Sequence, residues 1–460
     1  MKRKISILLH LFILLALSAC GIATPSPMPS PTATPQPSRL PDPDEVKALL
    51  VQVVDEERRV PGIVVGMIAE DPQERWVVGY GRMNDVDDRV PDGDTVFEIA
   101  SITKVFTVIL LAQAVLNGEV KLDDPISMYL PEGVLAPEYE SKSITLLDLA
   151  THTSGLPRVP GGVSSYANYT PDQMYAFLSG YRLTRAPGST YEYSNYGFGL
   201  LGNLLARIAS QEDYEALLLD RITEPLGMDS TRIVLTPDME SRLATPHLSY
   251  SVLTSSSNAP AFAGCGAIRS TANDMLTFLA ANMGMTGTEL QPALQLAITP
   301  QRPTDGSDYI GLGWRVPKSG QGMHSHGGQN DGYHSYLSWD SERRIGIVVL
   351  ANATVDIEDV GLQLMGSLPE SVPVDPQVLA AYAGRYQLPD GVILTIRVDG
   401  MRIFTQGPNQ QEHELYARSE NQFCPIAFEM EITFYKNENG EVDRLVFVEN
   451  GVTYEAKKVP

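Results

Sequence analysis

An apolar segment directly after a Ser-x-x-Lys pair is the feature that most constrains this chain. Residues 105–116 would be apolar on nearly every face of a helix, and Asn117 with Gly118 is a typical helix stop. A helix without a polar face has to lie inside a hydrophobic core. If it begins at Ser101, residues three apart share a face, so the Lys104 amine can approach the Ser101 hydroxyl. We therefore expect a buried helix that holds Ser101 at its N-terminal end, where backbone N–H groups face an incoming oxyanion.

The composition allows one large core and a further domain. The chain has 460 residues, of which 43% are hydrophobic and 20% are charged, and this is neither a disordered nor a fibrous composition. The formal net charge of −22 argues against nucleic acid as a partner and favours a protein exposed to water.

The N-terminal residues are typical of an export leader. Basic residues 2–4 precede an apolar run at 5–17, and small residues lead to Cys20. The run is too short for a comfortable membrane span, and the residues before Cys20 resemble a bacterial lipoprotein cleavage site. We predict a signal peptide at 1–19, lipidation of Cys20, and an exported, extracytoplasmic cell-envelope lipoprotein anchored in the membrane. The alternative is an ordinary secretory leader that leaves no anchor.

A tether follows the leader. Residues 20–41 are rich in Pro, Ser and Thr and cannot pack a core. Because proline-rich chain extends by about 3.1 Å per residue, this segment could hold a domain roughly 60 Å from a membrane. With Cys20 assigned to the anchor, Cys265 and Cys424 remain, and either one disulfide or two free thiols is compatible with the sequence.

The pattern of residues 42–368 predicts one domain in which strands at the two ends flank a helical section. Strand patterns occur near both ends, at 63–68, 76–80, 309–314, 334–339 and 345–350. Helix patterns lie between them, most clearly at 146–150, 171–178, 198–209, 214–219 and 273–283. The expected fold class is α/β (α+β): an antiparallel sheet built from both chain ends, flanked by helices, with a helical subdomain inserted. The active site should lie at the junction.

Residues 373–460 predict a separate small antiparallel β-barrel. Short alternating strands are separated by hairpin signals at Asp399-Gly400, Asn439-Gly440 and Asn450-Gly451.

Two later motifs give the serine and the lysine their chemical partners. Ser101 is a weak nucleophile unless a neighbouring group removes its proton. Tyr193 is a second candidate base beside Lys104, and Asn195 carries an amide donor and acceptor. His326 precedes Gly327 and Gly328, which would let a ligand approach a strand closely.

Together these stretches resemble the β-lactamase-related, penicillin-binding-protein-like serine hydrolases, which include class C β-lactamases, D-amino-acid peptidases and esterases. The segment 97–107 is similar to their first motif, 144–157 to a typical loop, 193–195 to the second motif and 326–328 to the third. The resemblance implies the β-lactamase/transpeptidase-like fold. The C-terminal segment around 382–386 resembles the lipocalin-like domain that some of these hydrolases carry.

The resemblance also implies the roles of the site residues. Lys104 and Tyr193 together would deprotonate Ser101, protonate the leaving group and activate the deacylating water, so Ser101, Lys104 and Tyr193 are the expected catalytic residues. The expected substrate-binding residues, with the Gln329 N–H completing an oxyanion hole with that of Ser101, are Asn195, His326, Gly327, Gly328 and Gln329. Many members of the family have a lysine at the position of His326. A histidine there offers a weaker positive charge than lysine to a substrate carboxylate.

Each assignment has a structural alternative. A Ser-x-x-Lys pair is expected about once by chance in a chain of this length, and Ser101 alone would be explained as a helix N-cap. Tyr193 and Asn195 alone could be a packed aromatic and a turn residue. We expect no metal at His324 and His326, because no third ligand has supporting spacing.

Taken jointly, the motifs predict a serine hydrolase without a cofactor. It would form an acyl-enzyme at Ser101 and act on a small molecule or short peptide: D-amino-acid peptides, β-lactams or small esters. Alternatives are a penicillin-recognising sensor that acylates with little turnover, and a binding protein with an inactive site. His152 is expected to be a structural loop residue.

Overall fold

The computed structural model describes residues 40–460 except 71–73, 87, 162–167, 255–259, 305, 307, 368–370, 408–411, 426–429 and 450–451. The predicted signal peptide and lipidated Cys20 therefore lie outside the described residues. No helix in the described part of the chain is both long and apolar enough to cross a membrane.

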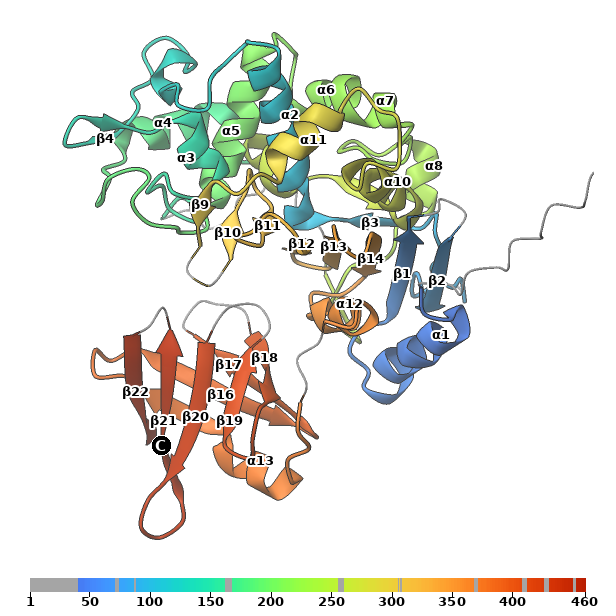
Figure 1. Cartoon of the computed structure of the whole chain (residues 1–460), viewed down its shortest axis with the longest axis vertical. Helices are drawn as coiled ribbons and strands as arrows, with labels where there is room; N and C mark the ends of the chain where they lie inside the picture. Colours follow the sequence, from blue (N-terminus) through green and yellow to red (C-terminus); the bar gives the residue numbers. More distant parts are fainter. Residues whose placement is uncertain are drawn as a thin grey trace, which may run out of the picture. The chain divides into compact units, whose positions relative to one another are not determined.

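One antiparallel eight-stranded sheet organises the part of the chain before residue 368 (Figure 1). Strands from the two ends of this part meet in its middle, where Val64 pairs with Leu350. In spatial order the strands are β2 (Arg75–Gly81), β1 (Gly62–Ala69), β14 (Ile345–Ala351), β13 (His334–Asp340), β12 (Met323–Gln329), β11 (Arg315–Val316), β10 (Tyr309–Ile310) and β9 (Arg302–Pro303). The predicted sheet is confirmed.

Helices lie on both faces of the sheet, and most belong to the section between β2 and β9. They are α1 (Pro43–Val51), α2 (Thr103–Leu116), α3 (Leu146–Ala150), α4 (Pro171–Gly180), α5 (Asn195–Ile208), α6 (Tyr214–Leu218), α7 (Glu224–Leu226), α8 (Pro237–Ser241), α9 (Ala263–Gly266), α10 (Ala272–Asn282), α11 (Gln291–Ala297) and α12 (Glu358–Leu364). Short strand pairs join these helices: β3 (Val96–Glu98) with β8 (Arg269–Thr271), β4 (Glu138–Tyr139) with β5 (Lys142–Ser143), and β6 (His247–Ser249) with β7 (Val252–Leu253). The expected helical subdomain is present.

The alternation of side chains along the strands produces two cores. Val64 and Ile68 of β1 pack with α2 and α10 on one face, whereas Val65 and Met67 pack with α1 and α12 on the other. The α2 helix is buried along nearly its whole length, as its apolar sequence requires. This packing fixes the N-terminal end of α2 at the edge of the larger core.

One predicted strand, at 309–314, is wrong beyond its second residue. Strand β10 ends at Ile310, and the Gly311 N–H bonds to the Trp314 carbonyl 2.9 Å away, which makes a turn. Gly313 has a left-handed φ of +73°, and a Cβ there would lie 3.1 Å from the Val108 side chain. The close approach of the turn to α2 overrides the strand pattern of the sequence.

The C-terminal part contains helix α13 (Pro376–Tyr382) and a closed barrel. The barrel strands are β15 (Gly384–Gln387), β16 (Ile393–Asp399), β17 (Arg402–Gln406), β18 (Glu412–Ala417), β19 (Gln422–Pro425), β20 (Met430–Lys436), β21 (Val442–Glu449) and β22 (Val452–Val459). Gly400 and Gly440 lie in two of the predicted hairpins with φ of +61° and +82°. The signal at Asn450-Gly451 lies outside the described residues. The barrel is confirmed, and its lipocalin-like character stays a prediction.

Cys265 and Cys424 are both free thiols, Cys265 buried and Cys424 half-buried. Of the two alternatives for these cysteines, the structure has the free thiols.

Candidate active site

Ser101 lies in a single turn of 3-10 helix, Ala100–Ile102, directly before α2. The expected helix start at Ser101 is therefore displaced to Thr103. The cause lies in the backbone before it, because Ala100 has a left-handed φ of +44°, which an α-helix does not accommodate. Such strain is typical of functional sites, and here it places a serine at a sharp bend between β3 and α2.

Lys104 is fully buried and contacts Ser101. Its Nζ lies 3.0 Å from the Ser101 Oγ and donates a hydrogen bond to the Cys265 carbonyl at 2.7 Å. Cys265 belongs to the one-turn helix α9. The last carbonyls of a helix have no partner within it, so the Cys265 carbonyl can accept the hydrogen bond from Lys104. Among the described residues, no carboxylate lies within ion-pair distance of Lys104, and its partners are the Ser101 hydroxyl and the Cys265 carbonyl.

Two threonines hold α9 in register with α2. The Thr107 hydroxyl donates to the Gly264 carbonyl at 2.6 Å, and the Ile268 N–H donates to the Thr103 hydroxyl at 3.1 Å. Cys265 is separated from Lys104 by more than 150 residues, so nothing in the local sequence identifies its carbonyl as a partner of the lysine.

Tyr193 lies beside Lys104 and is held by His152. The Lys104 Nζ is 4.9 Å from the centre of the Tyr193 ring. The imidazole of His152 stacks on that ring with centroids 4.3 Å apart and planes inclined by 29°. The His152 Nδ1 accepts a hydrogen bond from the Ser194 N–H at 3.0 Å, so the proton of the neutral ring is on Nε2, which is buried without a partner.

His152 remains neutral because burial, followed by the nearby charge of Lys104, lowers its pKa well below the usual range. Its backbone has a left-handed φ of +56°, and its carbonyl accepts from the Glu192 N–H at 2.8 Å. His152 therefore connects the loop at 151–157 to the Tyr193 segment at three points. The structural role predicted for it is more specific than expected, because its partners are site residues.

Ser194 and Asn195 begin helix α5. The Ser194 hydroxyl accepts from the Gly197 N–H at 2.9 Å and donates to the Pro157 carbonyl at 2.7 Å, so Ser194 is the N-cap. The Asn195 side-chain oxygen is buried without a hydrogen-bond partner in the described part of the chain. An unpaired amide oxygen two residues after Tyr193 can accept a hydrogen bond from a ligand N–H.

The third motif lies on β12 against the Ser101 turn. A Cβ added to Gly328 would be 2.3 Å from the Ile99 carbonyl oxygen and 3.0 Å from the Ser101 nitrogen. A Cβ added to Gly327 would be 1.9 Å from a carboxylate oxygen of Glu358. Gly328 is therefore required by a close approach to backbone within the protein itself, whereas the neighbour of Gly327 is the end of a side chain.

The Gln329 N–H points away from the sheet interior. The following residue, Asn330, bonds through its N–H to the Tyr333 carbonyl at 3.1 Å. Hydrogen bonds alternate along an antiparallel pair, so Gln329, paired with His334, directs its N–H away from β13. With Gly328 against the Ser101 nitrogen, this geometry is compatible with two N–H donors facing one oxygen.

His326 is buried and uncharged. Burial, followed by the charge of Lys104, lowers its pKa to about 3. Its Nδ1 lies 2.7 Å from the Gly327 carbonyl, and a carbonyl can only accept, so Nδ1 carries the proton and Nε2 is an acceptor. His324 turns to the Gly322 carbonyl and stacks on Trp339, and no group of potential metal ligands occurs among the described residues.

A buried ion pair connects these elements. Glu98 of β3 accepts from Arg269 at 2.7 Å and from the Asn330 side chain. Because Asn330 directly follows β12, Glu98 fixes the third motif relative to the strand that precedes Ser101. A glutamate next to the first motif is the only sequence signal for this contact.

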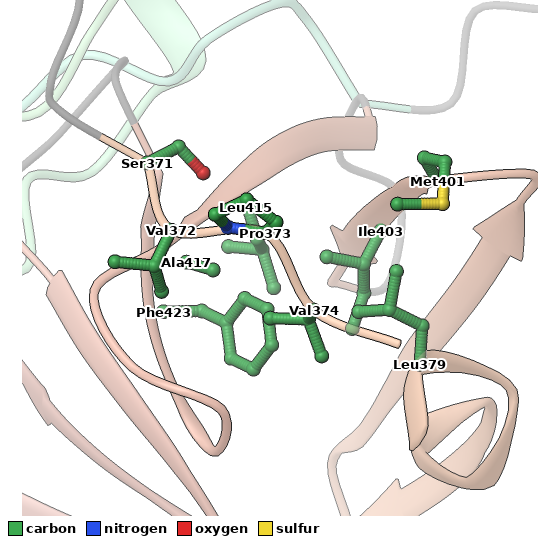
Figure 2. A pocket seen from close by; sticks show the side chains of 10 residues that line it. All are labelled: Ser371, Val372, Pro373, Val374, Leu379, Met401, Ile403, Leu415, Ala417 and Phe423. Atoms are coloured by element: carbon green, nitrogen blue, oxygen red, sulfur yellow. The ribbon is translucent and has the colours of Figure 1, made fainter. Parts of the chain in front are cut away.

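A small apolar pocket of about 180 Å³ lies elsewhere, between the segment at 371–374 and the barrel (Figure 2). Its lining is Ser371, Val372, Pro373, Val374, Leu379, Met401, Ile403, Leu415, Ala417 and Phe423. It contains no titratable group and none of the residues around Ser101, so it supplies no catalytic chemistry.

Two family models match the chain. One, described as Beta-lactamase, matches residues 47–365, and the other, described as Domain of unknown function (DUF3471), matches residues 368–458.

Individual proteins are similar over long stretches. The D-alanyl-D-alanine-carboxypeptidase/endopeptidase AmpH of Escherichia coli (strain K12) is 32% identical over 337 residues, which cover 67% of this chain and 86% of that protein. Penicillin-binding protein 4* of Bacillus subtilis (strain 168) is 24% identical over 455 residues, which cover 88% of this chain and 97% of that protein. The solved β-lactamase/D-alanine carboxypeptidase from Yersinia pestis, complexed with citrate, has a TM-score of 0.59 at 29% identity and covers 69% of this chain and 98% of its own.

Proposed function

Because the chain belongs to the β-lactamase family, we propose that it is a serine hydrolase that forms an acyl-enzyme at Ser101 and transfers the acyl group to water. The observation that carries this proposal is the 3.0 Å contact between the Ser101 Oγ and the Nζ of a fully buried Lys104. An amine at hydrogen-bond distance from a serine hydroxyl can take the serine proton as the hydroxyl attacks.

In the first step the Ser101 hydroxyl passes its proton to the Lys104 and Tyr193 pair while Oγ attacks the acyl carbon. The resulting oxyanion is stabilised by the N–H groups of Ser101 and Gln329. As the intermediate collapses, the bond to the leaving amine or alcohol breaks, and Tyr193 returns the proton to that leaving group. An ester between the acyl group and Ser101 remains.

In the second step a water molecule gives a proton to the same pair and attacks the ester. Collapse releases the acyl group as a carboxylic acid, and the proton returns to the Ser101 Oγ. Lys104 and Tyr193 act together in both steps, since the Lys104 Nζ lies 4.9 Å from the centre of the Tyr193 ring. Asn195 accepts a hydrogen bond from the substrate through its unpaired side-chain oxygen.

The substrates we propose are amides or esters of small molecules: short D-amino-acid peptides, β-lactams or small esters. The name of the Escherichia coli relative, a D-alanyl-D-alanine-carboxypeptidase/endopeptidase, supports the first of these. The neutral His326 at the third motif offers no positive charge to a substrate carboxylate.

Labelling with a fluorophosphonate probe, followed by a panel of D-peptides, β-lactams and esters, tests the proposal. We expect wild type to be labelled and to turn over at least one substrate class, and Ser101→Ala to do neither. Ser241→Ala, which changes an exposed serine on α8, is the matched control. Labelling that persists in Ser101→Ala would overturn the assignment. A stoichiometric burst without steady-state turnover would support the penicillin-recognising sensor instead.

We also propose that the protein is exported and anchored through a lipid on Cys20. This proposal rests on the basic, apolar and small-residue order at 2–20 and on the Pro-rich segment behind it. Mass spectrometry of the N-terminal peptide should find a diacylglyceryl group on Cys20. The Cys20→Ser variant should no longer be found in the membrane fraction. An unmodified cysteine would overturn the anchor and favour the secreted alternative.

A further inference from the structure

Arg158 places an exposed guanidinium beside the candidate catalytic tyrosine. Its Cζ lies 5.1 Å from the centre of the Tyr193 ring, and its side chain is exposed to solvent. The backbone around it is fixed to the second motif at two points. The Ser194 hydroxyl donates to the Pro157 carbonyl at 2.7 Å, and the Tyr196 N–H donates to the Arg158 carbonyl at 3.0 Å. The position of this arginine is therefore coupled to that of Tyr193.

Arg158 has no acidic partner among the described residues. The other arginines near this loop do: Arg302 bonds to Asp148, and Arg185 pairs with Glu192. The sequence itself offers none close by, because no Asp or Glu occurs between Asp148 and Asp172. In a chain with 56 acidic and 34 basic residues, a guanidinium without a carboxylate is available to a ligand that brings one.

The other cations around the site are occupied or neutralised. Lys104 is buried and bonded to Ser101 and Cys265. His326 is uncharged, with its protonated nitrogen turned to the Gly327 carbonyl. Burial raises the pKa of Glu358, but His334 and then the charge of Arg315 lower it, and the net shift is downward. The charge of Arg315 therefore interacts with a carboxylate. In the described structure, Arg158 is thus a positive charge without an acidic partner beside Tyr193.

We propose that Arg158 binds a carboxylate on the leaving group of the substrate, so that the enzyme prefers acyl donors whose departing part ends in a free acid. This inference rests on the proposed function. Tyr193 returns a proton to the leaving group, so the leaving group has to lie next to Tyr193. A guanidinium over the same ring then lies on the leaving-group side, where it can donate two parallel N–H bonds to a carboxylate.

Two esters that share one acyl group test the inference. The leaving alcohol of one is a 2-hydroxy acid with a free carboxylate, and that of the other is the corresponding neutral carboxamide. We expect Arg158→Ala to lower the acid-to-amide ratio of kcat/KM roughly tenfold, since a charge-assisted hydrogen bond is lost. Arg158→Lys should retain part of the preference. Arg182→Ala, which removes an exposed arginine and the same unit of charge, should leave the ratio within about threefold.

The two proposals fail in different ways. Hydrolysis of either ester that survives in Ser101→Ala would overturn the acyl-enzyme at Ser101, whatever Arg158 does. Hydrolysis that depends on Ser101 but shows the wild-type ratio in Arg158→Ala would overturn only the carboxylate role. If hydrolysis is slow, the rates at which two phosphonate esters modify Ser101, one whose leaving alcohol carries a carboxylate and one whose leaving alcohol carries a carboxamide, give the same ratio and the same two outcomes.

Discussion

The imidazole of His152 stacks on the ring of Tyr193 with centroids 4.3 Å apart, and its Nδ1 accepts the N–H of the next residue, Ser194. One neutral side chain thus fixes both the ring plane of the proposed base and the backbone that carries it. Because the Lys104 Nζ lies 4.9 Å from the same ring, a shift of Tyr193 would also change the surroundings of the lysine. His152 is accordingly a positioning residue for the proposed reaction.

Two substitutions of His152 separate the ring stack from the hydrogen bond. His152→Asn keeps an acceptor and tolerates the left-handed backbone, so it should remain within about 1 kcal/mol of wild type in free energy of unfolding. His152→Phe keeps a ring but leaves the Ser194 N–H unpaired, which costs about 1–3 kcal/mol.

Both His152 variants should lower kcat more than they raise KM, because a tilted Tyr193 transfers protons less well while the substrate contacts persist. Urea titration and steady-state kinetics measure the two effects. Wild-type kcat in both variants would contradict the positioning role.

Lys104→Met should abolish acylation without unfolding the protein. Methionine has a similar volume and removes only the buried amine. The Cys265 carbonyl loses its donor, so we expect the free energy of unfolding to change by no more than about 2 kcal/mol. Probe labelling should fall at least about a thousandfold. A folded variant that is still labelled at the wild-type rate would exclude Lys104 as the base.

Tyr193→Phe should trap the acyl-enzyme. The ring remains for His152 and Lys104 to contact, and only the hydroxyl is lost. If Tyr193 activates the deacylating water, deacylation should slow by about a hundredfold or more. Intact-protein mass spectrometry after mixing with an ester should then show the added acyl mass. Tyr175→Phe, on α4, is the control and should not accumulate it. Equal acyl levels in the two variants would remove Tyr193 from this step.

Sequence patterns were sufficient to predict the architecture because buried strands and helices have recognisable apolar patterns in the local sequence. The apolar run at 63–68 predicts a strand and the apolar run at 105–116 predicts the helix α2, and both segments are buried in the structure. The strand predicted at 309–314 fails because its last residues are shaped by contact with α2, as Gly313 shows. Local patterns carry no information about such tertiary contacts.

The same distinction applies to the site. Ser101 and Lys104 are three residues apart, so helical geometry predicts their contact. The Cys265 carbonyl that holds Lys104 is a backbone group far along the chain, and no side-chain pattern can indicate it. No sequence pattern indicates Arg158 either, because its proposed role depends on its position beside the Tyr193 ring. Motifs therefore predict which side chains react, and the folded structure supplies the groups that position them.

Gly328→Ala should inactivate the enzyme by displacing the Ser101 turn. A Cβ would lie 2.3 Å from the Ile99 carbonyl, a backbone atom that cannot move without shifting Ser101. We expect a loss of activity of at least about a hundredfold, with destabilisation of about 1–3 kcal/mol from overpacking. Gly287→Ala is the matched control, because a Cβ there meets nothing within 4 Å. Similar activities in the two variants would show that the turn tolerates the displacement.

The buried histidines predict how stability depends on pH. The pKa of His326 is about 3 in the folded protein, lowered mainly by burial, against an ordinary value of 6.5. Between these values the unfolded chain binds a proton that the folded protein does not. Stability should therefore be complete above about pH 6.5 and fall as the pH decreases, by up to about 1.4 kcal/mol per pH unit for this residue. His152 acts in the same direction because its pKa is also lowered.

His326→Gln tests this contribution by urea titration between pH 4 and 8. Above pH 7 the difference in free energy of unfolding between wild type and variant should be constant, which serves as the internal control. Below about pH 6.5 the wild type should lose stability faster, with a slope steeper by up to about 1.4 kcal/mol per pH unit. Parallel curves over the whole range would mean that His326 gains its proton at the same pH in the folded protein and in the unfolded chain. The third motif would then carry a positive charge below about pH 6.5, where it would share a substrate carboxylate with Arg158.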